Sequence, residues 1–292
     1  MKNHKSGFVS IVGSPNVGKS TLMNKLLGEK LSIVTSKAQT TRHRIRGILN
    51  HPDYQIVFSD TPGVVNAAYE LHDTMMSYVS TSLSDADVLL FITDVFEDTL
   101  NHKATLQKIK DMRIPIICLI NKMDLRSQDV VAERIDYWTK ELPNAKILPI
   151  SALHNFNVDP ILQLILSHLP NSPAYFDKDA ISDRPMRFFI SEIIREKIFL
   201  NLKKEVPYAC QVEVTDYEEE EDIIRIRANI IVERDSQKGI IIGAKGRQLK
   251  HIGIDSRKDI EKFVDKHVFL QTFVKVDKDW RSNEGKLKKY GY

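Results

Sequence analysis

The sequence holds 292 residues, which is enough for two compact domains, and 42% of them are hydrophobic, so each domain can fill a core. Its 42 basic and 39 acidic residues leave a formal charge of +3, which excludes a globally basic nucleic-acid binder and makes any basic surface local. Two distant cysteines exclude a disulfide scaffold, and the sequence shows neither a secretion signal nor a membrane-length apolar run, so we expect a cytoplasmic protein.

Short apolar runs alternate with amphipathic helical patterns as far as residue 168. A turn at NHPD, residues 50–53, joins RIRGIL to YQIVF and predicts one antiparallel edge strand. The pattern predicts an α/β nucleotide-binding domain over residues 1–171, with a mostly parallel sheet covered by helices. The runs that we expect to form its buried strands lie at residues 8–12, 54–58, 88–95, 115–121 and 145–151.

The segment GSPNVGKS, residues 13–20, lies between a predicted strand and a helical pattern, which is the setting of the phosphate-binding pattern G-x-x-x-x-G-K-[ST]. Backbone N–H groups of such a loop point at phosphates, and a side chain at Gly13 or Gly18 would obstruct them. Lys19 would pair with the β- and γ-phosphates, and the Ser20 hydroxyl would bind Mg²⁺. The residues expected to contact the nucleotide here are Gly13, Ser14, Pro15, Asn16, Val17, Gly18, Lys19, Ser20 and Thr21.

The segment DTPG, residues 60–63, ends the strand pattern YQIVFS and predicts a second element beside the phosphates. Asp60 would reach the metal ion through water, the Gly63 amide would sense the γ-phosphate, and Thr61 and Pro62 complete the contacts. The next residue is Val64, where Ras-like GTPases carry a glutamine that orients the attacking water. Because valine offers no hydrogen bond, another group must supply this help, or the protein binds GTP without significant hydrolysis.

The segment NKMD, residues 121–124, ends a later strand pattern and predicts which base is bound. The Asp124 carboxylate can accept hydrogen bonds from guanine N1–H and the exocyclic amine, whereas adenine offers neither donor there. GTP is therefore expected, which argues against the alternative of a metabolic P-loop kinase or ATPase. The triplet SAL, residues 151–153, would support the base through the amide of its alanine. The base-contacting residues expected from these segments are Asn121, Lys122, Asp124, Ser151, Ala152 and Leu153.

Residues 172–185 are rich in proline, serine and charge without periodicity, so we expect a linker there and a second domain over residues 186–292. The second segment shows the order helix, two strands, two helices around a glycine loop and a final strand, which is typical of a small α+β domain. We interpret the acidic run at residues 218–222 as a solvated hairpin loop, with a docking patch as the alternative.

GAKG, residues 243–246, is a G-x-x-G segment of the kind with which KH domains clamp single-stranded RNA. Its glycines would let the RNA backbone approach, and nearby cations would meet phosphates. The isoleucines at 240–242 would form an apolar groove floor for unstacked bases. The alternative is a helix turn in a domain that docks a protein. The residues expected to bind RNA in this region are Gly243, Ala244, Lys245, Gly246, Arg247 and Lys250.

In their order along the chain, these segments resemble the Era family of bacterial GTPases, of the TrmE-Era-EngA type, which carries a C-terminal type II KH domain. Residues 37–47, KAQTTRHRIRG, resemble its switch I and imply that Thr41 binds Mg²⁺ and the γ-phosphate, with Thr40 as the alternative. Similar GTPases pair an apolar residue at the position of Val64 with a phosphate-loop asparagine that holds a potassium ion, here Asn16; a merely loop-stabilising asparagine is the alternative. The implied catalytic residues are Lys19, Thr41, Gly63 and Asn16, with Ser20, Thr41 and Asp60 as Mg²⁺ ligands and Asn16 for K⁺.

The resemblance also implies partners and a function. The family binds the 3′ end of small-subunit (16S) ribosomal RNA during maturation of the small ribosomal subunit, so we expect a GTPase with GTP, GDP, this RNA and that subunit as partners. The tail at 277–292 resembles the family's ending, where Trp280 and Arg281 would contact RNA together with Lys286, Lys288 and Lys289; a frayed terminus is the alternative. We expect a monomer whose basic patches allow peripheral contact with the cytoplasmic membrane face. The alternatives are an RNA-binding GTP switch without significant hydrolysis and a P-loop protein whose second domain docks a protein.

Overall fold

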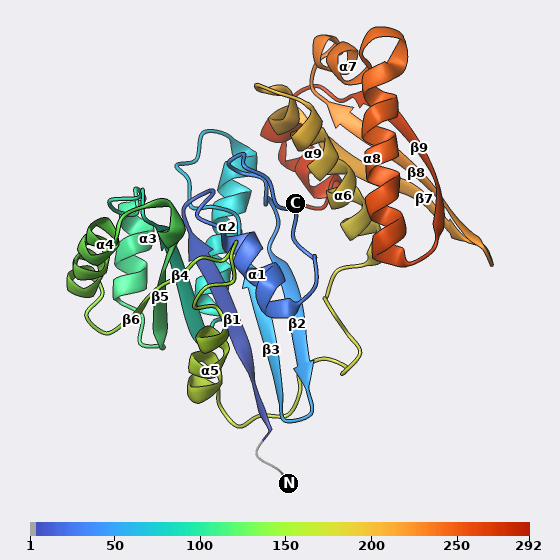
Figure 1. Cartoon of the computed structure of the whole chain (residues 1–292). Coiled ribbons are helices and arrows are strands. Elements are labelled where there is room, and N and C mark those ends of the chain that lie inside the picture. Colours follow the sequence, from blue (N-terminus) through green and yellow to red (C-terminus); the bar gives the residue numbers. More distant parts are fainter. Residues whose placement is uncertain (1–3) are drawn as a thin grey trace. The chain divides into compact units, whose positions relative to one another are not determined.

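The computed structural model describes residues 4–292, which form two compact units (Figure 1). Unit 1 extends to Asp183, apart from the short segment Tyr69–Leu71, which groups with unit 2. Unit 2 extends from Arg184 to Tyr292. Within residues 4–292, no helix combines the length and the apolar character needed to cross a membrane.

Unit 1 is built on a six-stranded sheet with the strand order β2-β3-β1-β4-β5-β6. All neighbouring strands pair in parallel except β2 and β3, whose antiparallel pairing confirms the edge hairpin predicted from the NHPD turn. Every residue of β4 is buried, because helices cover both faces of the sheet, which is why its sequence is apolar without alternation. The strands are β1 (Lys5–Gly13), β2 (Ile45–His51), β3 (Tyr54–Asp60), β4 (Val88–Asp94), β5 (Ile116–Asn121) and β6 (Lys146–Pro149).

Helices α2, α3 and α4 pack on one face of this sheet, in a core that contains Phe91, Cys118 and Trp138. Helices α1 and α5 cover the opposite face (Figure 1). Because the strands run in parallel, the loops that follow their carboxyl ends gather at one edge of the sheet. The helices of unit 1 are α1 (Lys19–Leu27), α2 (Glu70–Ser84), α3 (Lys103–Lys110), α4 (Gln128–Glu141) and α5 (Asp159–His168), with a 3₁₀ turn, η1 (Met123–Leu125).

The predicted linker is attached to unit 1 over most of its length. Gln55 is completely buried, and its side chain bonds to the backbone of Tyr175 and Phe176. Further along, the Ile48 amide donates to the Ile181 carbonyl at 3.0 Å. Residues 172–183 therefore belong to unit 1, and only two residues separate them from the first helix of unit 2.

Unit 2 has the order helix, strand, strand, helix, helix, strand, which confirms the predicted small α+β domain. Its central strand, β8, pairs antiparallel with β7 and parallel with β9. Isoleucines of α6, β8 and α8 form its core, together with Cys210. The elements are α6 (Met186–Asn201), β7 (Gln211–Glu219), β8 (Ile223–Val232), α7 (Asp235–Ile242), α8 (Arg247–Val264) and β9 (His267–Val276), with 3₁₀ turns η2 (Val206–Ala209) and η3 (Ala244–Gly246).

The C-terminal segment, with η4 (Trp280–Ser282) and α9 (Glu284–Lys289), is packed into unit 2 and is not a frayed tail. Trp280 is completely buried, and its indole N–H donates to the Ala209 carbonyl at 3.0 Å. Arg281 forms an ion pair with Glu233. The predicted stacking of Trp280 on RNA is therefore wrong, because its ring fills a core, whereas the RNA contact of Arg281 stays a prediction. Lys286 is likewise paired with Asp277.

Candidate functional site

The phosphate loop, residues 13–20, joins β1 to α1 at the carboxyl edge of the sheet. A Cβ added at Gly13 would lie 1.9 Å from the Ile92 carbonyl oxygen on β4, so the neighbouring strand requires glycine there. Gly18 has a φ of +102°, in the left-handed region that favours glycine, and an added Cβ would lie 2.2 Å from the amide nitrogen of Asn121. Packing of the loop thus requires both glycines, in addition to the predicted approach of phosphates.

Lys19 lies inside the phosphate loop and is buried. Its Nζ atom donates to the carbonyl oxygens of Gly13 at 3.1 Å and Ser14 at 2.7 Å. Burial lowers the pKa of Lys19 to about 8, although the negative charges of Asp60 and Glu97 act in the opposite direction. The side chain therefore presents a cation to the cavity at neutral pH.

Three oxygen atoms from three segments meet beside Lys19. The Ser20 hydroxyl donates to Asp60 Oδ2 at 2.6 Å and lies 3.0 Å from the Thr41 hydroxyl. Asp60 is fully buried, its Oδ1 atom makes no hydrogen bond within residues 4–292, and burial raises its pKa. Mg²⁺ prefers oxygen ligands of this kind, and a cation would compensate the unpaired buried oxygen, so these residues fit the metal.

The adjacent threonines of switch I differ in the surroundings of their hydroxyls. Thr40 Oγ1 donates to the Lys37 carbonyl at 2.8 Å and lies 2.7 Å from Thr35 Oγ1, within the switch itself. The Thr41 hydroxyl instead faces Ser20. Thr41, and not Thr40, therefore lies with the candidate magnesium ligands.

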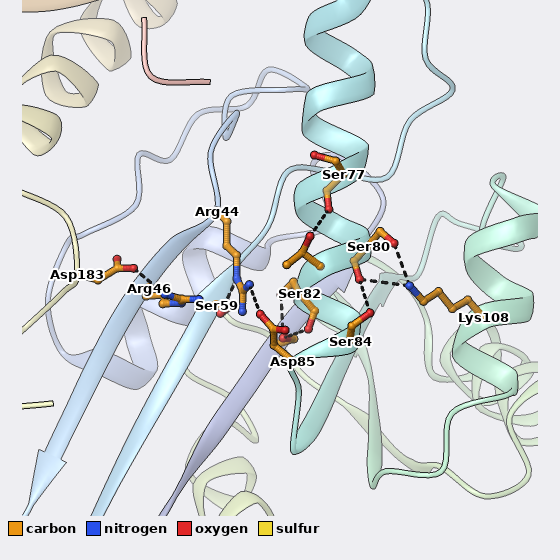
Figure 2. A network of polar contacts seen from close by, with 12 residues as sticks. Arg44, Arg46, Ser59, Ser77, Ser80, Ser82, Ser84, Asp85, Lys108 and Asp183 are labelled. Carbon is orange, nitrogen blue, oxygen red and sulfur yellow. Dashed lines mark hydrogen bonds and ion pairs between the residues drawn. The ribbon is translucent and has the colours of Figure 1, made fainter. Parts of the chain in front are cut away.

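Switch I is fixed at its C-terminal end by Arg44, as Figure 2 shows. The Arg44 guanidinium pairs with Asp85, directly after α2, at 2.7 Å, and its Nε atom donates to Ser59 at 3.2 Å. Arg44 is buried, and Ser59 directly precedes Asp60 on β3. This network links switch I, the end of β3 that carries Asp60 and the end of α2.

The residue after Gly63 does not face the cavity. Val64 is 5% exposed and belongs to the core of unit 1, while its amide donates to the Gly13 carbonyl at 3.1 Å. Gly63 does line the cavity, where an added Cβ would lie 2.7 Å from Pro15. Asn16 also faces the cavity; its Nδ2 atom donates to the Ser36 carbonyl at 2.7 Å, and its Oδ1 atom makes no hydrogen bond in the described part of the chain.

The predicted base-reading residues gather at the other end of the same cavity. Asn121 holds the loops together, since its Nδ2 atom donates to Val17 O at 2.7 Å and its Oδ1 atom accepts from the Ala152 amide at 2.9 Å. This use of the Ala152 amide differs from its predicted direct contact with the base. Asp124 has 25% of its side chain exposed, and its Oδ2 atom lies 3.6 Å from Nε2 of His154.

All these elements enclose one cavity of about 560 Å³. The predicted residues that line it are Pro15, Asn16, Gly18, Lys19, Ser20, Thr21, Thr41, Gly63, Asn121, Lys122, Asp124, Ser151 and Leu153. The predicted residues that do not line it are Gly13, Ser14, Val17, Asp60, Thr61, Pro62 and Ala152.

The loop that follows β4 also belongs to the site, although no residue of it was predicted from the sequence. Asp94 Oδ2 forms an ion pair with Lys122 at 2.6 Å, and its Oδ1 atom accepts from the Phe96 amide at 2.9 Å. The Phe96 ring lines the cavity and stacks with the Arg126 guanidinium, whose carbon lies 4.7 Å from the ring centroid. The signal was available, because FITD ends a buried parallel strand at the same edge as the recognised motifs.

Unit 2 carries a second concave surface, which we call the α8–β9 groove. The groove has a volume of about 470 Å³ and begins at Gly246 of the G-x-x-G segment. Lys245, Arg247 and Lys250 are exposed and form no ion pair within residues 4–292. The residues that line the groove are Gly246, Leu249, Lys250, Gly253, Ile254 and Arg257 from η3 and α8, and Val268, Phe269, Leu270 and Thr272 from β9.

The groove floor differs from the predicted one. Ile240 is exposed on α7, Ile241 is in the core and Ile242 packs against that core, so none of them lines the groove. The floor instead comes from residues at three- and four-residue spacing on α8. Gly253 is central to it, because an added Cβ would find only Thr272 Oγ1, at 3.9 Å. This helical glycine, inside an amphipathic pattern, was the signal for a close approach.

Comparison with known families follows the division into two units. The family described as 50S ribosome-binding GTPase matches residues 8–122, and the family described as KH domain matches residues 205–281. GTPase Era of Staphylococcus haemolyticus is 42% identical over 294 residues, which cover 100% of this chain and 98% of that protein. GTPase Era of Geobacter metallireducens is 46% identical, over 99% of this chain and 98% of that protein.

Two solved structures resemble the whole chain. A crystal structure of Era with MgGDPNP and nucleotides 1506–1542 of 16S ribosomal RNA has a TM-score of 0.94 and 39% identity, with 99% of both chains covered. A crystal structure of an Aquifex aeolicus Era variant bound to GDP and AlF₄⁻ has the same TM-score of 0.94 and 38% identity, again over 99% of both chains.

Proposed function

Since this chain belongs to the Era family of GTPases, we propose that unit 1 hydrolyses GTP and that unit 2 binds the 3′ end of 16S ribosomal RNA during assembly of the small ribosomal subunit. The observation that carries the proposal is the cavity that Lys19, Ser20, Thr41 and Asp124 line together. Phosphate, metal and guanine can be bound there at once. A protein similar over its full length binds both a GTP analogue and this RNA.

Guanine recognition rests on Asp124, whose carboxylate would accept from N1–H and the exocyclic amine. Asn121 acts indirectly, because it ties the phosphate loop at Val17 to the SAL segment at Ala152. Lys122 is held by Asp94, so its alkyl chain is fixed beside the base. Because the Asn121 side chain and the Lys122 ammonium group already have partners, Asp124 is the acceptor that selects the base.

Ser20, Thr41 and Asp60 are the residues that would hold Mg²⁺. When bound, the ion would neutralise charge on the β- and γ-phosphates during transfer to water. Lys19 would turn from the carbonyl oxygens of Gly13 and Ser14 towards the same phosphates. Thr41 links the metal to switch I, so loss of the γ-phosphate would release that segment.

A potassium ion held by Asn16 would supply positive charge at the phosphates, where Val64 gives no help. The Val64 side chain is buried, and its amide is used by Gly13, so neither can orient water. Asn16 Oδ1 faces the cavity from the phosphate loop without a hydrogen bond among residues 4–292, which suits a ligand of a monovalent cation. Gly63 lines the same cavity and would contribute its backbone amide to the γ-phosphate. We assign catalytic roles to Lys19, Thr41, Gly63 and Asn16 on this basis.

In unit 2, the RNA backbone would pass the segment from Gly243 to Arg247, and unstacked bases would enter the α8–β9 groove beside Lys250. The exposed cations there are free of acidic partners in the described structure, which favours phosphate as their ligand. Trp280 has no part in this binding, because its ring is buried in unit 2. The monomeric state and the contact with the membrane face stay predictions.

The test is steady-state GTP turnover in potassium and in sodium buffer, with and without an RNA oligonucleotide of the 16S 3′ end. Potassium should raise turnover of the wild type, and Asn16→Ala should abolish this difference while guanine nucleotide still binds. Equal turnover in both salts would refute the role of Asn16. If the oligonucleotide binds neither the free protein nor the GTP-loaded protein, the role of unit 2 is refuted.

A further inference from the structure

A carboxylate, that of Glu97, contacts the phosphate loop without lining the cavity. The Ser14 hydroxyl donates to Glu97 Oε1, and the Thr93 hydroxyl donates to Glu97 Oε2 at 2.8 Å. Neither Ser14 nor Glu97 lines the nucleotide cavity. Thr93 is the second-last residue of β4 and is fully buried, so the Glu97 side chain is held by a rigid element.

Ser14 connects this carboxylate to the lysine of the loop. Its carbonyl oxygen accepts from Lys19 Nζ at 2.7 Å, while its hydroxyl donates to Glu97. Lys19 and Glu97 form no direct ion pair in the described residues, but the negative charge of Glu97 reaches Lys19 across the loop. The lysine expected to meet the phosphates is thus linked, through Ser14, to a carboxylate that does not line the cavity.

We propose that Glu97 is a positioning residue that determines how strongly the loop prefers GDP or GTP. Its negative charge, which acts through Ser14 and Lys19, weakens binding of the γ-phosphate more than binding of the α- and β-phosphates. Binding of GTP therefore takes up a proton at Glu97, which removes that opposition. This inference rests on the proposed function, because it assumes that the cavity binds guanine nucleotides.

The surroundings of Glu97 favour such a proton uptake. Burial raises its pKa, and the nearby charge of Asp94 does the same. The hydroxyls of Ser14 and Thr93 and the charge of Lys19 lower it. Together these groups, from the phosphate loop, α1 and β4, leave the pKa of Glu97 above its usual value, and a further negative charge nearby would favour the neutral acid more strongly.

Three variants separate the charge of Glu97 from its hydrogen bonds. Glu97→Gln keeps an oxygen that can accept from Ser14 but removes the charge. Asp98→Asn is the matched control, because Asp98 has 90% of its side chain exposed and pairs with Arg134 on the surface. Thr93→Val keeps the charge and the shape but removes a donor to the carboxylate, so it should increase proton uptake.

The experiment is calorimetric titration of the full chain with GDP and with GDPNP at pH 6.5, in buffers of different ionisation enthalpy. This pH lies below the pKa of Lys19, about 8, so Lys19 stays charged. The wild type and Asp98→Asn should take up more protons with GDPNP than Glu97→Gln does. The GDPNP-to-GDP affinity ratio of Glu97→Gln should rise roughly threefold to tenfold.

Titration of the analogue's own phosphate is common to all variants and cancels in the comparison. Equal proton uptake and an equal affinity ratio in wild type and Glu97→Gln would overturn the proposal. If Glu97→Gln does not fold, as judged by circular dichroism, unchanged uptake in Thr93→Val would overturn it instead. If the wild type binds neither nucleotide, the proposed function fails and the inference fails with it.

Discussion

At the scale of single residues, Asp124 decides which base the cavity accepts. In Asp124→Asn the amide replaces a carboxylate, so two charge-assisted hydrogen bonds to guanine are lost or inverted. We expect GDP affinity to fall by about 3 kcal/mol, or about a hundredfold, in a fluorescent-nucleotide titration. Xanthine nucleotide, which carries an oxygen in place of the exocyclic amine, should bind the variant better than the wild type. Unchanged GDP affinity would remove Asp124 from the site.

Lys19 predicts a pH dependence of nucleotide binding. Its pKa in the free protein is lowered to about 8, whereas bound phosphates would raise it, so binding takes up a proton at higher pH. GDP affinity should be constant below this pKa and fall by up to about tenfold per pH unit above it. Lys19→Arg, which stays charged throughout, should lose this slope even where it binds more weakly. A slope retained in Lys19→Arg would assign it to another group.

At the scale of an element, α8 leaves room for the α8–β9 groove because it carries a glycine, Gly253, that has no side chain. Gly253→Leu would place a side chain in the open space opposite Thr272. We expect RNA affinity to fall by about tenfold or more, or about 1.4 kcal/mol. The helix itself should gain about 0.8 kcal/mol, since glycine is a poor helix former. Gly239→Ala on α7, where an added Cβ meets nothing within 4 Å, is the control and should bind RNA normally.

Elements also show what the sequence could and could not predict. The strands of unit 1 and the order of unit 2 were predictable, because their apolar periods are local and each cavity motif follows a strand end. Trp280 was not, because an aromatic residue beside basic residues has the same pattern whether it stacks on RNA or fills a core. The prediction that the isoleucines at 240–242 form the groove floor was wrong for a similar reason. A continuous apolar run does not reveal which face of a short helix is buried. The Ala152 amide was assigned to the base, and only the fold showed that Asn121 reaches it.

At the scale of the whole chain, one buried side chain helps to fix residues 172–183, which precede unit 2, to the sheet of unit 1. Gln55 accepts from the Tyr175 and Phe176 amides at 2.7 and 3.0 Å and donates to the Phe176 carbonyl at 2.8 Å. In Gln55→Leu these backbone groups lose their partner, and detachment of residues 172–183 should follow, at a cost of roughly 1–3 kcal/mol. Limited proteolysis should then cut within 172–183 much faster than in the wild type. Lys178→Ala, which removes only exposed contacts, is the control. Equal cleavage rates would show that other contacts hold the segment.

The two cysteines have a consequence for how the chain can be studied. Cys118 lies in the core of unit 1 and Cys210 in the core of unit 2; both are buried, and neither forms a disulfide within residues 4–292. Burial raises the pKa of the Cys118 thiol, so it is inert while unit 1 stays closed. A thiol reagent can therefore label each unit only at the rate at which that unit opens. The labelling rates of the two cysteines therefore report the opening of unit 1 and of unit 2 separately. Mass spectrometry of the labelled peptides would show in which unit a ligand slows opening.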